Sequence, residues 1–257
     1  MSVETLLLKL LLVPLFLLLV SLAGKRWGPG IAGWLAGLPL VVGPILYFVA
    51  LEQGPQFAAQ AATAAVAAVV ASIAFGVAYS HCSRIARWPM ALLAATTAWL
   101  AVSVLLAAVP LSLWSSFAAA FAVLMVAPYC FPPTTSSASA PATGYIELAL
   151  RMAAGAALTF GVTLAAGAVG PRWSGLLAVF PVLGTVLAVF SHQQQGGDAA
   201  TQLLHGMARG FFSFLGFCLA VAIALHHLSV PAAFALAIGV SLAIQLLTRK
   251  PPAAARG

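Results

Sequence analysis

Four polar residues that can bind a solute recur along one apolar stretch, residues 198–225. They are Asp198, Gln202, His205 and Arg209, spaced at i, i+4, i+7 and i+11, which is one face of a helix with 3.6 residues per turn. Charged side chains within a membrane cost about 2.5–3.5 kcal/mol each on insertion scales and mark solute or proton pathways. Arg209 is a planar cation that suits carboxylate or phosphate, and His205 can carry a proton near neutral pH. The pattern predicts a site for a small polar or anionic solute.

These residues also have structural interpretations. Asp198 is well placed as the N-cap of its helix, and Arg209 can be an interhelical hydrogen-bond anchor. The two lie about 16 Å apart along the helix at 1.5 Å per residue, so Arg209 needs another partner, such as Glu147, Glu52, a backbone carbonyl or a bound anion. Glu147 and Arg151 are spaced i, i+4 and most simply neutralise each other.

Weaker candidates lie in the first half of the chain. Gln60 and Thr63 form a shorter, uncharged polar stripe within residues 56–80. Polar turns add three more candidates for the solute site, namely Glu52, Gln53 and Gln195.

Two prolines fall inside apolar stretches at corresponding places, Pro39 within residues 31–51 and Pro181 within residues 173–192. Proline removes an intrahelical hydrogen bond and breaks or kinks a helix, which frees carbonyls that can line a site. Interrupted segments at corresponding positions of two halves are the best sequence-level indication of a transporter's binding site. The alternative is a pair of packing kinks without a ligand.

The composition decides the broad class. The 257 residues are 63% hydrophobic and only 6% charged, whereas a soluble domain has about 25% charged residues. This excludes a cytosolic enzyme, and the net charge of +7 is scattered among apolar runs, so it forms no nucleic-acid-binding face. The three cysteines, Cys82, Cys130 and Cys218, match no metal or redox spacing, and we expect neither a metal nor a cofactor.

A bilayer core requires about 20 apolar residues per helix, and the chain contains about nine such stretches. They are residues 4–23, 31–51, 56–80, 89–109, 111–130, 145–169, 173–192, 198–225 and 231–248. The apolar runs are continuous and lack the alternation of membrane strands. We therefore expect an all-α, polytopic integral membrane protein with about nine transmembrane helices.

The chain is similar to itself at a shift of 142 residues, where residues 33–60 lie over residues 175–202. The matches include residue types that are scarce in lipid-facing sequence: Pro39 with Pro181, Gln53 with Gln195, Gly54 with Gly196, and Gln60 with Gln202. Such self-similarity is typical of an internal repeat. The expected domains are residues 1–110, a first four-helix repeat; 111–143, a connecting span and linker; 144–249, a second four-helix repeat; and 250–257, a disordered cytoplasmic tail.

The distribution of Lys and Arg predicts the orientation, because cytoplasmic loops are enriched in both. With the N-terminus outside, seven loop residues face the cytoplasm and only Arg172 faces outside. The seven are Lys25, Arg26, Arg84, Arg87, Arg249, Lys250 and Arg256. The odd number of spans then inverts the second repeat relative to the first, an architecture common among secondary transporters.

The second half begins with YIELALRMAAGAALTFGVTLAAGAVGPRWSGLLAVFPVLGTVLAVFSHQQQGG, residues 145–197. This segment resembles the small four-span membrane proteins of the GlpM family in an early basic residue, a basic loop before the second span, a proline within that span and a polar turn ending in glycine. The resemblance implies a duplicated and fused relative of that family. Where such families carry an acid–base pair in the turn, this chain has Glu52-Gln53 and Gln194-Gln195.

These patterns favour a secondary transporter or permease with a site between the two proline-broken spans. The alternative is a non-transporting structural or accessory subunit of an envelope or polysaccharide assembly system. We do not expect an enzyme, because no nucleophile–base spacing is present. The expected location is the cell membrane (the inner membrane in a bacterium), and the partners are the bilayer, a small solute and a second copy of the chain, but no nucleic acid.

Overall fold

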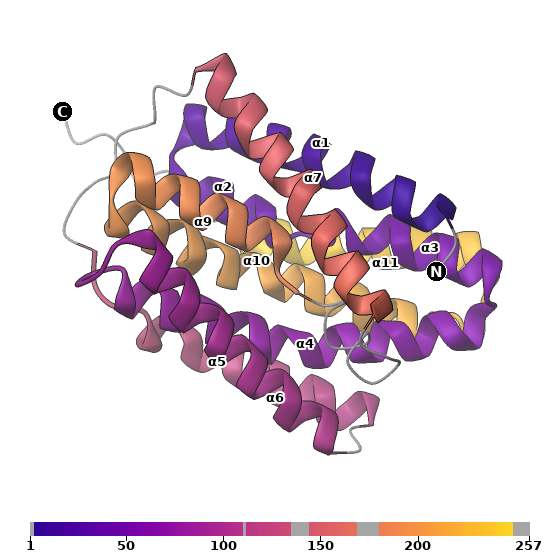
Figure 1. Cartoon of the computed structure of the whole chain (residues 1–257). Helices are drawn as coiled ribbons and strands as arrows, with labels where there is room; N and C mark the ends of the chain where they lie inside the picture. The colour runs from indigo at the N-terminus through magenta and orange to yellow at the C-terminus, as the bar shows by residue number, and fades with distance from the viewer. Residues whose placement is uncertain (1–2, 110–111, 135–143, 169–179, 249–257) are drawn as a thin grey trace.

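The computed structural model describes residues 3–109, 112–134, 144–168 and 180–248, and all regular structure within these ranges is α-helical (Figure 1). The helices are α1 (Val3–Trp27), α2 (Pro29–Ala36), α3 (Val42–Glu52), α4 (Pro55–Cys82), α5 (Trp88–Ala108), α6 (Leu113–Cys130), α7 (Tyr145–Ala168), α9 (Val182–Gln195), α10 (Gly197–Ala224) and α11 (Val230–Leu247). The expected tail (250–257), most of the linker and the start of the span at 173–192 lie outside the described residues.

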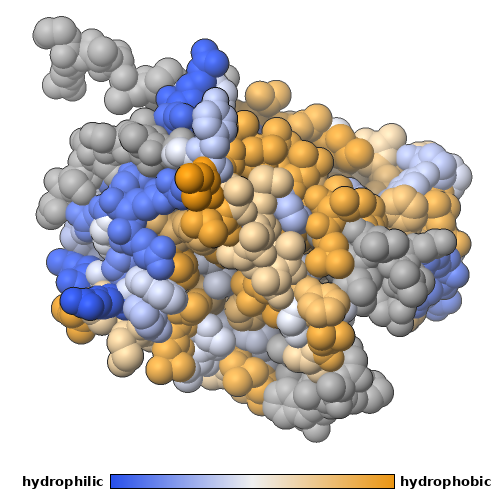
Figure 2. Space-filling view, turned by 45° about the horizontal axis from the view of Figure 1, so that its top comes forward, coloured by the Kyte–Doolittle hydropathy of each residue, from blue (hydrophilic) through white to orange (hydrophobic). Residues whose placement is uncertain are grey.

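Seven helices are long and apolar enough to cross a membrane: α1, α4, α5, α6, α7, α10 and α11. Their outward faces carry large apolar side chains, for example Leu11, Leu93 and Leu105. Figure 2 shows an apolar band across the visible face, with hydrophilic surface gathered at its two ends. Such a surface is stable when lipid is its solvent. The chain therefore has the architecture of a multi-pass integral membrane protein.

Helices α4 and α10 form the centre of the bundle. Two thirds of the α10 span and half of the α4 span are buried, compared with one third or less for the other five long helices. The two central helices run in opposite directions, because Gly197 at the start of α10 lies against Ser83 at the end of α4. Helices α1 and α7 are likewise antiparallel, since Arg151 of α7 bonds to Ser21 of α1 and Gly155, one turn later in α7, lies against Leu17, one turn earlier in α1.

Four glycines bring α2 into direct contact with α10. Gly33 of α2 and Gly37, the C-cap of α2, face the Gly206–Gly210 segment of α10, and a methyl group added to Gly37 would come within 2.6 Å of the Gly210 Cα. Small residues four apart on both helices allow this approach, as in GxxxG contacts between membrane helices. The contact fixes α2, and with it the start of the break that follows, against the most buried helix.

The second apolar stretch is two short helices rather than one continuous span. Helix α2 ends at Ala36 and α3 begins at Val42, and the break falls at Pro39, which has no N–H to continue the helical ladder. The Leu40 amide donates instead to the Leu38 carbonyl over 2.8 Å, and the Gly43 amide donates to the Pro39 carbonyl over 2.8 Å. The first of these bonds closes a three-residue turn.

The same hydrogen bonds recur 142 residues later. The Val182 amide donates to the Phe180 carbonyl over 2.8 Å, and the Thr185 amide donates to the Pro181 carbonyl over 2.9 Å. Helix α9 begins directly after Pro181. Both described proline positions therefore have the same local backbone chemistry.

Helix boundaries also coincide at this shift. Adding 142 to α4 (Pro55–Cys82) gives α10 (Gly197–Ala224), and adding it to the start of α5 (Trp88) gives the start of α11 (Val230). The preceding glycines, Gly54 and Gly196, have φ angles of 93° and 85°, which glycine adopts without strain. Helices α5 and α6 are separate, ending at Ala108 and beginning at Leu113, so the predicted boundary near Pro110 is correct.

Candidate functional site

A cavity of about 320 Å³ lies where the two breaks meet the central helices. Its lining includes Leu38 and Val41 from the α2–α3 break and Phe180, Pro181 and Val182 from the start of α9. Helices α1, α4, α7 and α10 complete the wall. The volume is within the range of about 300–1,000 Å³ typical of small-molecule sites.

Six lining positions in the first half are each matched by a lining position 142 residues later. The pairs are Leu38 and Phe180, Val41 and Leu183, Val42 and Gly184, Ala65 and Met207, Val69 and Phe211, and Ser72 and Phe214. Corresponding elements of the two halves thus face each other across one space.

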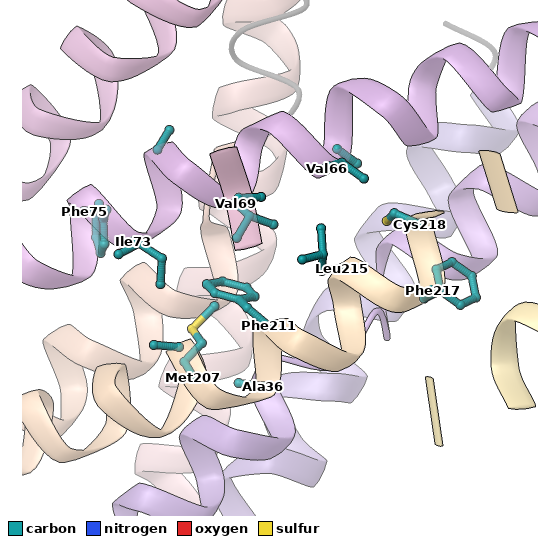
Figure 3. Close-up of a cluster of buried hydrophobic side chains, with 14 of the residues drawn as sticks. Ala36, Val66, Val69, Ile73, Phe75, Met207, Phe211, Leu215, Phe217 and Cys218 are labelled. Atoms are coloured by element: carbon teal, nitrogen blue, oxygen red, sulfur yellow. The ribbon is translucent and has the colours of Figure 1, made fainter. Parts of the chain in front are cut away.

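The two central helices line this space with side chains of different size. Helix α10 contributes Met207 and Phe211, and Figure 3 shows both directed toward Val69 of α4. The α4 residues matched to them, Ala65 and Val69, are small. The side chains of α10 therefore occupy part of the volume, and the cavity remains because the facing α4 residues are too small to fill it.

The cavity wall is apolar apart from three hydroxyls, those of Ser72, Thr159 and Thr163, and its described residues include no ionisable group. Ser72 Oγ donates to the Ala68 carbonyl over 3.0 Å. Thr159 is only 4% exposed, and its Oγ1 has no hydrogen-bond partner among the described residues. Buried hydroxyls are nearly always paired, so Thr159 is the lining side chain with unused hydrogen-bonding capacity.

The polar stripe of α10 lies outside this lining. At about 100° per helical residue, Arg209 is 160° away from both Met207 and Phe211, which face the cavity. Arg209 is half-buried, and its Nε has no partner among the residues that the structure describes. His205 stacks on Phe131, just after α6, with ring centroids 5.2 Å apart. The stripe therefore faces the connecting helix, not the breaks.

Asp198 and Gln202 are also absent from the cavity wall. The predicted N-cap role of Asp198 is wrong: Gly196 is the N-cap of α10, and Asp198 lies in the first helical turn. Its carboxylate is favourably placed near the positive end of the helix dipole. The helix begins two residues earlier than expected because Gly196 adopts a positive φ.

The remaining predicted polar residues do not converge on one point. Glu52, Gln53 and Gln60 are exposed, Thr63 donates to the carbonyl of Ala59 over 3.0 Å, and Gln195 is half-buried with no described partner for its Oε1. Among the predicted site residues, the structure brings only Pro181 to the cavity wall, while Pro39 lies in the break beside it.

A buried arginine connects three helices near one end of the bundle. Arg151 of α7 is 4% exposed and forms the expected pair with Glu147, at 2.6 Å between Nη2 and Oε1. Its Nη1 also donates to Ser21 Oγ of α1 over 3.3 Å, and its Nη2 to Gln194 Oε1 of α9 over 3.1 Å. The guanidinium lies 5.4 Å from the ring centroid of Phe190. We call these five residues the Arg151 cluster.

The sequence predicts only the local part of the Arg151 cluster. Glu147 is four residues from Arg151, but Ser21 and Gln194 are 130 and 43 residues away, and nothing in the spacing indicates them. Arg151 is eight residues before Thr159, about 12 Å along the helix. The cluster therefore holds α1, α7 and α9 together between the cavity and one end of the bundle.

Comparisons with known proteins add no relative: no family model, no curated protein and no solved structure matches this chain. The resemblance of residues 145–197 to the GlpM family stays a prediction.

Proposed function

We propose that this membrane protein is a secondary transporter or permease, and that its solute binds in the cavity between the α2–α3 break and the start of α9. The observation that carries the proposal is the matched lining, in which six positions of each half face one another across a single space. Broken helices at corresponding positions of two halves are typical of transporter sites near the middle of the membrane.

The proposed architecture is two inverted four-helix repeats joined by α6. Helices α1 to α5 form the first repeat, in which α2 and α3 together make one crossing, and residues 144–249 form the second. The coinciding helix boundaries support the repeat, and the antiparallel pairs α4–α10 and α1–α7 support its inversion (Figure 1). Nine crossings follow from this arrangement.

The proposed orientation places the N-terminus outside and the C-terminus in the cytoplasm. Lys25 and Arg26 end α1, while Arg84 and Arg87 follow α4. Both helix ends adjoin the α9–α10 turn. Arg151 bonds to both Ser21 near the end of α1 and Gln194 near the end of α9, and Ser83 after α4 lies against Gly197. These four basic residues thus share one end of the bundle, which the positive-inside rule assigns to the cytoplasm.

In this orientation the Arg151 cluster lies on the cytoplasmic side of the cavity. Transport by alternating access requires contacts on each side of a central site that form and break in turn. A network of one ion pair and two further hydrogen bonds between three helices can be formed or lost as a unit. We therefore assign the Arg151 cluster to closure of the cytoplasmic side.

The solute expected from the polar stripe, an anion held by Arg209, draws no support from the cavity, because Arg209 faces away from it. We assign the stripe to packing against the connecting helix. The alternative function is that of a non-transporting subunit of an assembly system. Such a subunit also uses a polar stripe for helix packing, but it requires no solute pathway. Solute flux distinguishes the two.

The test is flux across proteoliposomes with a panel of small solutes, comparing Ala68→Phe with Ala64→Phe. Ala68 lines the cavity, whereas Ala64, four residues earlier on the same helix, is exposed and is not part of the lining. We expect Ala68→Phe to abolish protein-dependent flux, and we expect Ala64→Phe and Arg209→Ala to retain it. Flux no greater than that of empty liposomes for every solute would remove the transport proposal.

A further inference from the structure

The cavity wall carries a second inference, which rests on the proposed function and names its substrate class. We infer that the cavity binds a neutral, mostly apolar small molecule with one hydrogen-bonding group of the alcohol or phenol type, recognised by Thr159.

The charge of the ligand follows from the wall. Its polar side chains are three hydroxyls, and its described residues include no acid, base or amide. On α7 the ionisable side chain next to the cavity is Arg151, about 12 Å along the helix from Thr159, and it is already bonded to Glu147, Ser21 and Gln194. An ion in this space would lose its hydration without gaining a counter-charge, so a neutral molecule is favoured.

The hydrogen-bonding group follows from Thr159. Thr63 and Ser72 on α4 satisfy their hydroxyls with the carbonyl four residues earlier, at 3.0 Å in each case. Thr159 makes no such bond within the described residues. Its exposed fraction is as small as that of the core side chains, and it borders the cavity. Leaving a buried hydroxyl unpaired is unfavourable. Oγ1 itself is buried, so a ligand in the cavity donates to it or accepts from it after the side chain rotates about χ1, and this hydrogen bond removes the cost.

The shape of the ligand follows from the aromatic side of the cavity. Phe180, Phe211 and Phe214 line it together with Met207, and Phe180 is held edge-on by Trp99 with ring centroids 5.1 Å apart. Aromatic rings favour edge-to-face and offset contacts with another ring, and the flexible thioether of Met207 adapts to ligands of different outline. A six-membered ring bearing one hydroxyl is thus a suitable probe.

The experiment measures equilibrium binding of benzyl alcohol, toluene and benzoate at pH 7 to the full chain in lipid nanodiscs. Binding to empty nanodiscs of the same lipid is subtracted, because apolar probes also partition into lipid. We expect one saturable site for benzyl alcohol and toluene, and none for benzoate. Ala68→Phe should abolish the site, and Ala64→Phe should leave it unchanged.

Thr159→Val isolates the hydroxyl, since it keeps the side-chain shape. The affinity for benzyl alcohol should fall about fivefold, the effect of one neutral hydrogen bond, while that for toluene stays the same. Thr159→Ser, which keeps the hydroxyl, should restore benzyl alcohol binding, and Thr97→Val on the exposed face of α5 should change neither probe.

Saturable benzoate binding at least as tight as that of benzyl alcohol would overturn the inference. So would the absence of a saturable site for the neutral probes, or an equal effect of Thr159→Val on benzyl alcohol and toluene. If any of these occurs while Ala68→Phe still abolishes flux of some other solute, the substrate class is wrong and transport stands. If the neutral probes bind as expected without any flux, transport is wrong and the ligand site stands.

Discussion

Replacing Arg151 by Met should destabilise the protein strongly, because it removes the centre of the Arg151 cluster. Met has a similar length and keeps the contact with the ring of Phe190, so the substitution mainly removes the charge and its hydrogen bonds. Glu147 loses its cation, and Ser21 and Gln194 lose a donor. Three helices are affected at once.

The magnitude follows from burial. Removing one partner of a buried ion pair costs about 3–5 kcal/mol. The Arg151 side chain is 5% exposed and that of Glu147 is 20% exposed, so water still reaches the carboxylate that is left behind. We therefore expect the free energy of unfolding to fall by about 3 kcal/mol, near the lower end of this range. The double variant Arg151→Met, Glu147→Leu leaves no uncompensated charge, and it should be within about 1 kcal/mol of the wild type.

The assay is reversible unfolding by SDS in mixed micelles, followed by circular dichroism. Arg209→Met is the matched control: it also removes a guanidinium from a span, but one whose Nε has no partner among the described residues. Its effect should stay within about 1 kcal/mol. Equal losses at the two arginines, or a loss below about 1 kcal/mol for Arg151→Met, would refute the assignment of Arg151 as the connection between α1, α7 and α9.

Three further predictions concern packing and orientation. Gly206→Ala should lower the melting temperature and reduce the free energy of unfolding by about 1–3 kcal/mol, because the added methyl meets a backbone carbonyl of α2. Gly239→Ala, with open space around it, should instead be neutral or stabilising. The reverse order of stability would contradict the close helix contact. Ser213→Ala should cost about 1 kcal/mol in SDS unfolding, since the Ser213 hydroxyl lies 2.7 Å from that of Ser241 on α11; an unchanged midpoint would show that this pair contributes nothing. In a chain whose three native cysteines are replaced by serine, Ile85→Cys, 91% exposed in the α4–α5 loop, should react with an impermeant maleimide in inside-out vesicles only. Labelling in intact cells would invert the proposed topology.

The sequence determines the features that depend on composition and on neighbours along the chain. An apolar content of 63% requires a lipid environment whatever the tertiary structure. Pro39 breaks its span because its ring and missing N–H act locally. The Glu147–Arg151 pair needs only one turn of helix, and Gly33, Gly37, Gly206 and Gly210 indicate close approach because small residues four apart let two helices come together.

Tertiary structure decides which face of each helix meets which neighbour. The sequence shows that Arg209 shares a face with His205, but α10 turns that face toward α6 and turns Met207 and Phe211 toward the breaks. Thr159 has no distinguishing spacing, and its unpaired hydroxyl is recognisable only beside the cavity. The physical reason is that lipid and the interior of a helix bundle are similarly apolar. Periodicity therefore does not mark the inward face of a membrane helix, and side-chain size and fit between helices determine it.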